Sequence, residues 1–371
     1  MYDFNQIIGH GHIIKNLRSS IAHGRINHAY LFEGEKGAGK MLLAQAFAKA
    51  LLCERRSGGV CNSCVSCITF DSGNQPDVLY VRPTKTKALG VDDIREQVNR
   101  EIATKPYQYD YKIFIIENAD GMTPAAQNAL LKTLEEPAPY GVFLLTAENA
   151  NRLLPTVLSR CFTVKLKPLP FEDVKGYLIR ETGLSEETAH FISVYAGGSI
   201  GQAVTVAADE KFVAMRGVML DILDGITERD LADVFAQAKA LESMKENIAD
   251  ALNIAFLWYR DIAVLKELND DTMILQKDIR DRLSENINIS AETVYNSLDA
   301  IAEAKHNLRF NANFQLAAEV LLMKLNAGTS MWTAAPAAGA SSKSDLLLRP
   351  ARSSAFLEKK ETKEKQTLWK S

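Results

Sequence analysis

The sequence predicts an α/β domain with a parallel β-sheet, followed by two helical units. Two observations support this prediction. Short apolar runs alternate with helical patterns over the first 165 residues, and helical periodicity with few strand signals follows. The chain has 371 residues, of which 47% are hydrophobic and 24% charged, a composition typical of a globular protein of two or three domains.

The first predicted strand leads directly into a glycine-rich loop. The apolar run AYLFE covers residues 29–33, and GEKGAGKM follows at residues 34–41. The next segment, KMLLAQAFAKALL at residues 40–52, has the apolar spacing of a helix. A loop between a strand and a helix places its N–H groups and the helix N-terminus where they can bind a phosphate.

This loop matches a phosphate-binding P-loop except at its last position. In the pattern G-x-x-x-x-G-K-[ST], the backbone wraps phosphates, the lysine reaches the outer phosphates and the hydroxyl holds Mg²⁺. The chain provides Gly34, Gly37, Gly39 and Lys40, but Met41 takes the hydroxyl position. The loop therefore predicts a degenerate site for ATP and Mg²⁺, and the alternative is a simple glycine turn.

Four of the five cysteines lie in the segment CERRSGGVCNSCVSC. Cys53 and the overlapping C-x-x-C turns of Cys61, Cys64 and Cys67 have the spacing of one tetrahedral Zn²⁺ site. Such a closed site has no position for substrate, so its predicted role is structural. The alternatives are a redox pair or reduced core thiols. Cys161 stands alone and is interpreted as a small buried apolar residue.

Three further strands and two helices complete the predicted sheet domain. One helix begins where Thr123 can cap it and Pro124 fits its first turn, and it ends before Pro137. Buried strands that alternate with helices favour a parallel sheet covered on both faces. The strands are predicted at residues 77–81, 112–116 and 141–146, and the helices at residues 91–103 and 124–136.

The segments GRINHAYLFEGEKGAGK, FIIENADGMTPAAQNALLKTLEEP and LLPTVLSRC together resemble the clamp-loader branch of AAA+ proteins. The four-cysteine insertion resembles the zinc module of bacterial clamp-loader subunits, and the resemblance covers roughly residues 5 to 326. It implies an AAA+ P-loop domain, a small helical lid and an all-α collar in which subunits join. The expected divisions are residues 1–166 with the zinc module at 53–67, the lid at 167–208, the collar at 209–328 and a disordered tail at 329–371.

The resemblance also indicates that the hydrolysis machinery is altered. Active relatives end a later strand with an Asp-Glu pair that supports Mg²⁺ and polarises water, whereas this chain has Glu117 and Asn118. In the segment AGGSIGQAV, Gly201 replaces the phosphate-sensing arginine of active subunits. Together with Met41, these departures predict that the chain does not turn over ATP.

One reactive element remains in the SRC motif. The resemblance implies that Arg160 reaches the ATP of a neighbouring subunit and neutralises charge that develops on the transferred phosphate. The alternative is a structural salt bridge at a helix end.

The expected function is that of a stator in a hetero-oligomeric ring with gamma/tau-like and delta-like subunits. Through this complex it helps to load a sliding clamp on primed DNA, as part of a DNA-directed DNA polymerase (nucleotidyltransferase) holoenzyme. The first alternative is an active ATP-hydrolysing motor of the gamma/tau type. The second alternative is a nucleotide or nucleoside kinase, but no segment provides its phosphate-acceptor site.

Charge and hydropathy restrict the partners further. A formal net charge of -3 argues against a free-standing DNA-binding module, so contact with DNA is expected to be shared with partners. The sequence has no apolar run of 18 or more residues and no secretory signal at its start. We therefore expect a cytoplasmic protein without membrane contacts.

Overall fold

The computed structural model describes residues 2–55, 58–84, 88–228, 230–242, 244–268, 273–310 and 312–326. The chain forms two compact units, and the first consists of Met1–Asp173 together with Ser199–Gln202. The second consists of Val174–Gly198 and the residues from Ala203 onward. The division into P-loop domain, lid and collar stays a prediction, and the predicted tail at 329–371 lies outside the described residues.

The first unit is built on a five-stranded sheet whose neighbouring strands are all parallel, in the order β2-β3-β4-β1-β5. The four predicted strands are confirmed within one residue at each end. The fifth was not predicted, because only Val164 of its four residues is buried and the segment FTVK lacks a long apolar run. The strands are β1 (Ala29–Glu33), β2 (Val78–Val81), β3 (Lys112–Ile116), β4 (Gly141–Ala147) and β5 (Phe162–Lys165).

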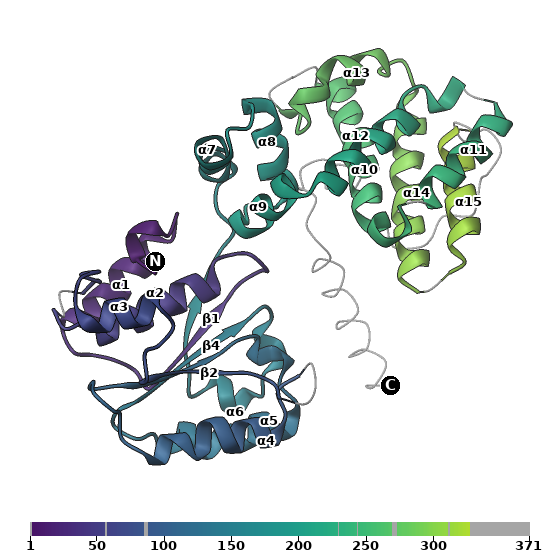
Figure 1. Ribbon diagram of the computed structural model, residues 1–371. Coiled ribbons are helices and arrows are strands. Elements are labelled where there is room, and N and C mark those ends of the chain that lie inside the picture. The colour runs from purple at the N-terminus through teal and green to yellow at the C-terminus, as the bar shows by residue number, and fades with distance from the viewer. Residues whose placement is uncertain are drawn as a thin grey trace. The chain divides into compact units, whose positions relative to one another are not determined.

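Helices cover both faces of this sheet (Figure 1). Side chains alternate between the faces along each strand, so Tyr30 and Phe32 pack with α2 while Leu31 packs with α5 on the opposite side. Each face therefore has its own apolar core. The first face carries α1 (Gly11–Ala22), α2 (Lys40–Leu52) and α3 (Val65–Asp71), and the second carries α4 (Val91–Ile94), α5 (Pro124–Glu135) and α6 (Pro155–Leu158).

The predicted helices of this unit form with one change of type. Helix α2 has the predicted bounds, and Thr123 caps α5 by accepting the Ala126 N–H. The segment 91–103 is helical but not one regular α-helix. It consists of α4, a π-helical turn at Arg95–Asn99 and a 3₁₀ turn at Glu101–Ala103.

The second unit is helical throughout its described residues, as predicted. Two aromatic residues of α12 belong to its core, since Trp258 and Tyr259 are each only 1% exposed. In α12, the buried Asp261 pairs with Arg260 at 2.6 Å and accepts the Gln276 N–H at 2.9 Å. The helices are α7 (Phe171–Thr182), α8 (Glu186–Tyr195), α9 (Ile200–Ala208), α10 (Glu210–Leu223), α11 (Leu231–Glu242), α12 (Ile248–Leu268), α13 (Arg280–Glu285), α14 (Ala291–Arg309) and α15 (Phe314–Asn326); α7 and α9 begin in the first unit.

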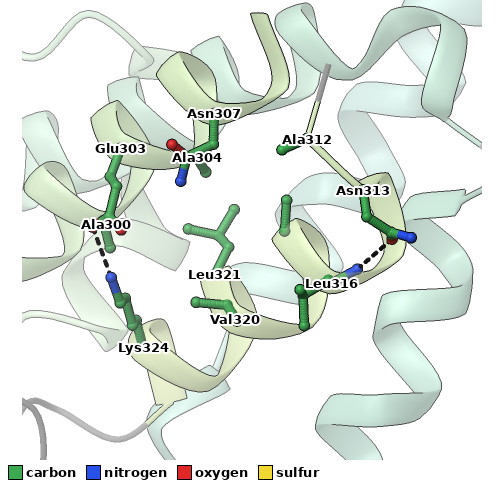
Figure 2. A pocket seen from close by; sticks show the side chains of 11 residues that line it. Ala300, Glu303, Ala304, Asn307, Ala312, Asn313, Leu316, Val320, Leu321 and Lys324 are labelled. Atoms are coloured by element: carbon green, nitrogen blue, oxygen red, sulfur yellow. Dashed lines mark hydrogen bonds and ion pairs between the residues drawn. The ribbon is translucent and has the colours of Figure 1, made fainter. Parts of the chain in front are cut away.

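Helices α14 and α15 and the loop between them line a mainly apolar, partly open pocket of about 170 Å³ (Figure 2). Leu321 and Val320 of α15 face Ala304 of α14 across it, and the ion pair of Glu303 and Lys324, 2.7 Å apart, bounds one side.

In the part of the chain that the structure describes, no helix combines the length and hydropathy needed to cross a membrane.

Candidate functional site

The predicted P-loop lies at the carboxyl edge of the sheet, between β1 and α2. Because parallel strands end at the same edge, Glu117 after β3 and Glu148 after β4 lie on this side of the sheet as well. The Gly34 N–H donates to the Ala147 carbonyl at 3.2 Å, which joins the beginning of the loop to the end of β4. The loop thus has the strand, turn and helix context of a phosphate site.

Lys40 is held by the backbone of its own loop. Its Nζ donates to the carbonyls of Gly34 and Glu35, each at 2.8 Å, and the residue is 8% exposed. Burial lowers the pKa of Lys40, while the carboxylates of Glu148 and Asp120 act in the opposite direction. The amine that reaches phosphate in a P-loop is therefore directed to loop carbonyls here.

The glycines and Met41 have different structural roles. Gly37 and Gly39 have φ angles of 75° and 86°, a region that glycine adopts without steric cost. Met41, one residue after Lys40, is partly buried and packs against the apolar core around α2. The position that would present a hydroxyl to Mg²⁺ thus contributes to packing.

Gly201 lies directly against the loop at Gly37. Its N–H donates to the Gly37 carbonyl at 3.0 Å, and the Ser199 hydroxyl donates to the Lys36 carbonyl at 3.0 Å. A Cβ on Gly201 would lie 2.7 Å from the Gly37 Cα, a distance that real Cβ atoms do not reach. In this arrangement the position has no room for any side chain, and hence none for an arginine.

Glu117 and Asn118 follow β3 as predicted, and both are exposed. Asn118 has a left-handed backbone with φ of 51°, and its N–H donates to the buried Thr146 hydroxyl at 3.1 Å. The turn after β3 is therefore fixed to β4. An amide side chain at this position has no negative charge with which to accept a proton.

Arg160 projects from the end of α6 and contacts Glu135, the last residue of α5. Its Nη2 lies 2.7 Å from the Glu135 carboxylate, and its Nη1 donates to the Thr156 carbonyl at 2.8 Å and the Ser159 hydroxyl at 3.3 Å. The Arg160 side chain is 32% exposed. The next residue, Cys161, is half-buried against the second core, and burial raises its pKa to about 12.

The four clustered cysteines converge as predicted. The sulfurs of Cys53, Cys61, Cys64 and Cys67 all lie within 4.8 Å of one another, and those of Cys61 and Cys67 are 4.0 Å apart. Four thiolates around one Zn²⁺ at about 2.3 Å would be about 3.8 Å apart, so the donor set fits this ion.

Hydrogen bonds to the Cys61 sulfur favour its thiolate form. The Cys64 N–H donates to the Cys61 sulfur at 3.3 Å, and the Cys67 N–H donates to the Cys64 sulfur at 3.4 Å. Hydrogen bonds from Ser63 lower the pKa of Cys61 to about 5, whereas burial raises the pKa of Cys53 and of Cys67. A bound cation would offset the cost of burying these latter thiolates.

A charged connection between the P-loop helix and the cysteine segment was not predicted. Lys49 of α2 is fully buried, and its Nζ contacts Asp71 at 2.8 Å and Asn62 at 2.7 Å. Asn62 lies between Cys61 and Cys64, and Asp71 ends α3. A signal was present in the sequence, because a lysine within the apolar run AFAKALL requires an anionic partner if it is buried.

This P-loop between β1 and α2, on a parallel sheet with the order β2-β3-β4-β1-β5, defines a P-loop α/β protein of the AAA+ class. The model of the family described as DNA polymerase III, delta subunit, matches residues 9–170. DNA polymerase III subunit delta-prime of Bacillus subtilis is 32% identical over 320 residues, which cover 85% of this chain and 96% of that relative. The chain therefore belongs to the delta-prime family of DNA polymerase III subunits, which confirms the expected clamp-loader subunit.

Two other similar proteins have related names. DNA polymerase III subunit tau of Bacillus subtilis is 24% identical over 87% of this chain, and the matched region spans 61% of that longer relative. A DNA polymerase III gamma subunit-related protein of Thermotoga maritima, known from a crystal structure, aligns with 19% identity over 84% of this chain and 98% of its own. The TM-score of that alignment is 0.39, so the family assignment rests on the sequence.

Proposed function

We propose that this delta-prime-type subunit is a cytoplasmic stator that turns over no ATP itself. It provides Arg160 to the ATP of a neighbouring gamma/tau-type subunit, while the hetero-oligomeric complex, with a delta-type subunit, loads a sliding clamp on primed DNA. Residues 167–208 act as the lid and residues 209–328 as the collar. The observation that carries the proposal is the direct backbone contact between Gly201 and Gly37.

This contact takes the place that a phosphate-sensing side chain needs. An arginine at position 201 can act only if its Cβ clears the loop, and here that Cβ would meet the Gly37 backbone. Met41 offers no oxygen ligand to Mg²⁺, and Asn118 has no charge with which to accept a proton from water. The backbone amides and Lys40 retain the means to contact a phosphate, but not to hydrolyse ATP.

Arg160 has the chemistry for a role outside its own chain. Its guanidinium is partly exposed and is oriented by Thr156 and Ser159 of its own helix end. A cation positioned in this way can neutralise charge that develops on a phosphate held by a neighbour. The chain then assists hydrolysis that it does not perform.

The cysteine cluster supports a structural Zn²⁺ as the cofactor. When bound, the ion would be held by Cys53, Cys61, Cys64 and Cys67, and it would fix the segment between α2 and α3. A four-sulfur site is closed to water and substrate, so the ion acts on folding and takes no part in ATP hydrolysis.

Two measurements test the stator proposal. The isolated chain should show no ATP hydrolysis above background, and steady turnover that Lys40→Ala abolishes would instead support a gamma/tau-type motor. In a complex reconstituted with gamma/tau-type and delta-type subunits, Arg160→Ala should lower clamp- and DNA-stimulated hydrolysis and clamp loading. An arginine finger contributes about 10³ to 10⁵ at a single site, but a ring with several sites dilutes the loss to a partial defect.

The matched variant Arg160→Lys separates charge from geometry. Lysine keeps the positive charge but loses the planar fork, so it should rescue the rate incompletely. If the alanine complex assembles and then hydrolyses ATP and loads clamps at the parental rate, Arg160 has only a structural role.

A further inference from the structure

The ion pair between Arg160 and Glu135 is separable from the contacts that orient Arg160. The Thr156 carbonyl and the Ser159 hydroxyl already bind Nη1 from within the same helix end. Glu135 comes from a different helix and binds Nη2 at 2.7 Å. Glu135 therefore adds a negatively charged partner to a guanidinium that already has two neutral hydrogen-bond acceptors.

A carboxylate and a phosphate are alternative partners for a guanidinium. Both present oxygens that match the same planar donors, and a paired arginine has less positive charge to offer a second anion. Glu135 is 48% exposed and Arg160 is 32% exposed, so the pair lies where an incoming anion can compete for it.

We propose that Glu135 restrains the arginine finger by competing with the neighbouring subunit's phosphate for Arg160. This inference rests on the proposed role of Arg160 in the complex. Engagement of the phosphate then requires that the Nη2 contact to Glu135 is released or shared. Release of the carboxylate adds a free-energy cost to the step in which Arg160 stimulates the neighbour. ATP hydrolysis by the complex is therefore lower before clamp and DNA are present.

The free-energy cost of releasing Glu135 is small because the ion pair is partly exposed to solvent. Exposed ion pairs contribute up to about 1 kcal/mol, which corresponds to about a fivefold change in rate. Glu135→Gln keeps the side-chain length and an acceptor oxygen but removes the charge. We expect this variant to raise ATP hydrolysis by the reconstituted complex, without clamp or DNA, about two- to fivefold.

Glu136→Gln is the matched control. It removes the same charge from the neighbouring exposed residue, which is not among the ion-pair and hydrogen-bond partners that the described residues give Arg160, and it should leave the rate unchanged. Glu135→Asp retains a carboxylate on a shorter side chain and should bring the rate back towards the parental value. The ratio of the Glu135→Gln rate to the parental rate should also fall towards one as salt rises, because salt screens the parental pair.

Arg160→Ala, measured in the same complex both with and without clamp and DNA, separates this inference from the proposed function. If Arg160→Ala lowers the rate but Glu135→Gln leaves it unchanged or lowers it, Glu135 does not restrain the finger, although the stator proposal stands. If Arg160→Ala has no effect on hydrolysis in the presence of clamp and DNA, the trans role itself fails. An increase that Glu135→Gln still causes in the Arg160→Ala background would also overturn the inference, because Glu135 would then act through another group.

Discussion

Lys49 Nζ lies 2.8 Å from the Asp71 carboxylate, and the Lys49 side chain is completely buried. The same Nζ donates to Asn62 at 2.7 Å, and the Asn62 amide donates to Asp3 at 3.1 Å. One buried cation in the P-loop helix therefore holds both the cysteine segment and the helix that follows it. The cysteine segment is anchored to the sheet domain through this side chain.

Lys49→Met should destabilise the first unit by about 2 to 3 kcal/mol, because it leaves Asp71 and Asn62 without their charged donor. Denaturant unfolding measures the loss, and Lys132→Met, at an exposed position of α5, is the control. A loss no larger than that of the control would show that the buried contact contributes little to stability.

Purified protein should contain about one Zn²⁺ per chain, and Cys64→Ser should release it, because a closed site requires all four sulfurs. Metal analysis of carefully reduced protein measures both quantities. Cys161→Ser is the control, since Cys161 is outside the cluster, and it should keep its zinc. Protein without zinc before any substitution would contradict the proposed site.

Gly201→Ala should destabilise the first unit by about 1 to 3 kcal/mol, because the added Cβ would force the Gly37 backbone to move. Gly11→Ala is a suitable control in the same unit. Gly11 begins α1, and a Cβ there would meet nothing within 4 Å, so this change should be neutral or slightly stabilising. Equal unfolding midpoints for the two variants would show that the contact at Gly37 is not tight.

Lys305 should make stability depend on pH. Burial lowers its pKa to about 8, while its Nζ donates to Asn253 at 2.8 Å and lies 5.1 Å from the centre of the Phe256 ring. Because the folded-state pKa is below the unfolded value of about 10.4, the unfolded chain binds more protons between these two values. The parental protein should therefore gain stability in this window as pH rises.

Lys305→Met removes this titration. The stability of the variant minus that of the parent should be constant below about pH 8 and should fall by about 2 to 3 kcal/mol up to about pH 10.4. Denaturant unfolding at several pH values measures the difference, in which the other titrating groups cancel. A difference that stays constant from neutral pH to pH 10 would show that Lys305 titrates normally.

The sequence predicted local structure well where one pattern dominates. The bounds of α2 follow from a long apolar periodicity after a glycine loop, and the start of α5 follows from Thr123 and Pro124. It missed β5, an edge strand with one buried residue in four, and the π-helical turn after α4, whose side-chain pattern still fits a regular helix.

The site was predicted as a set of residues but not as a set of contacts. The cysteine spacing was sufficient for the cluster, because its members are close in the chain. The contact of Gly201 with Gly37 and the pair of Arg160 with Glu135 depend on how distant segments pack, and neither is encoded in local periodicity. Their partners therefore came only from the structure.

The close approach of Gly201 to Gly37 also has an evolutionary consequence. Gly37 keeps a positive φ that the turn requires, so it cannot yield space by a simple change of residue, and a new side chain at position 201 displaces backbone. An arginine introduced at position 201 by one mutation would therefore displace the backbone at Gly37 before it offered any catalytic gain. On the proposed function, dependence on the ATP of a neighbour would therefore be hard to reverse by a single substitution.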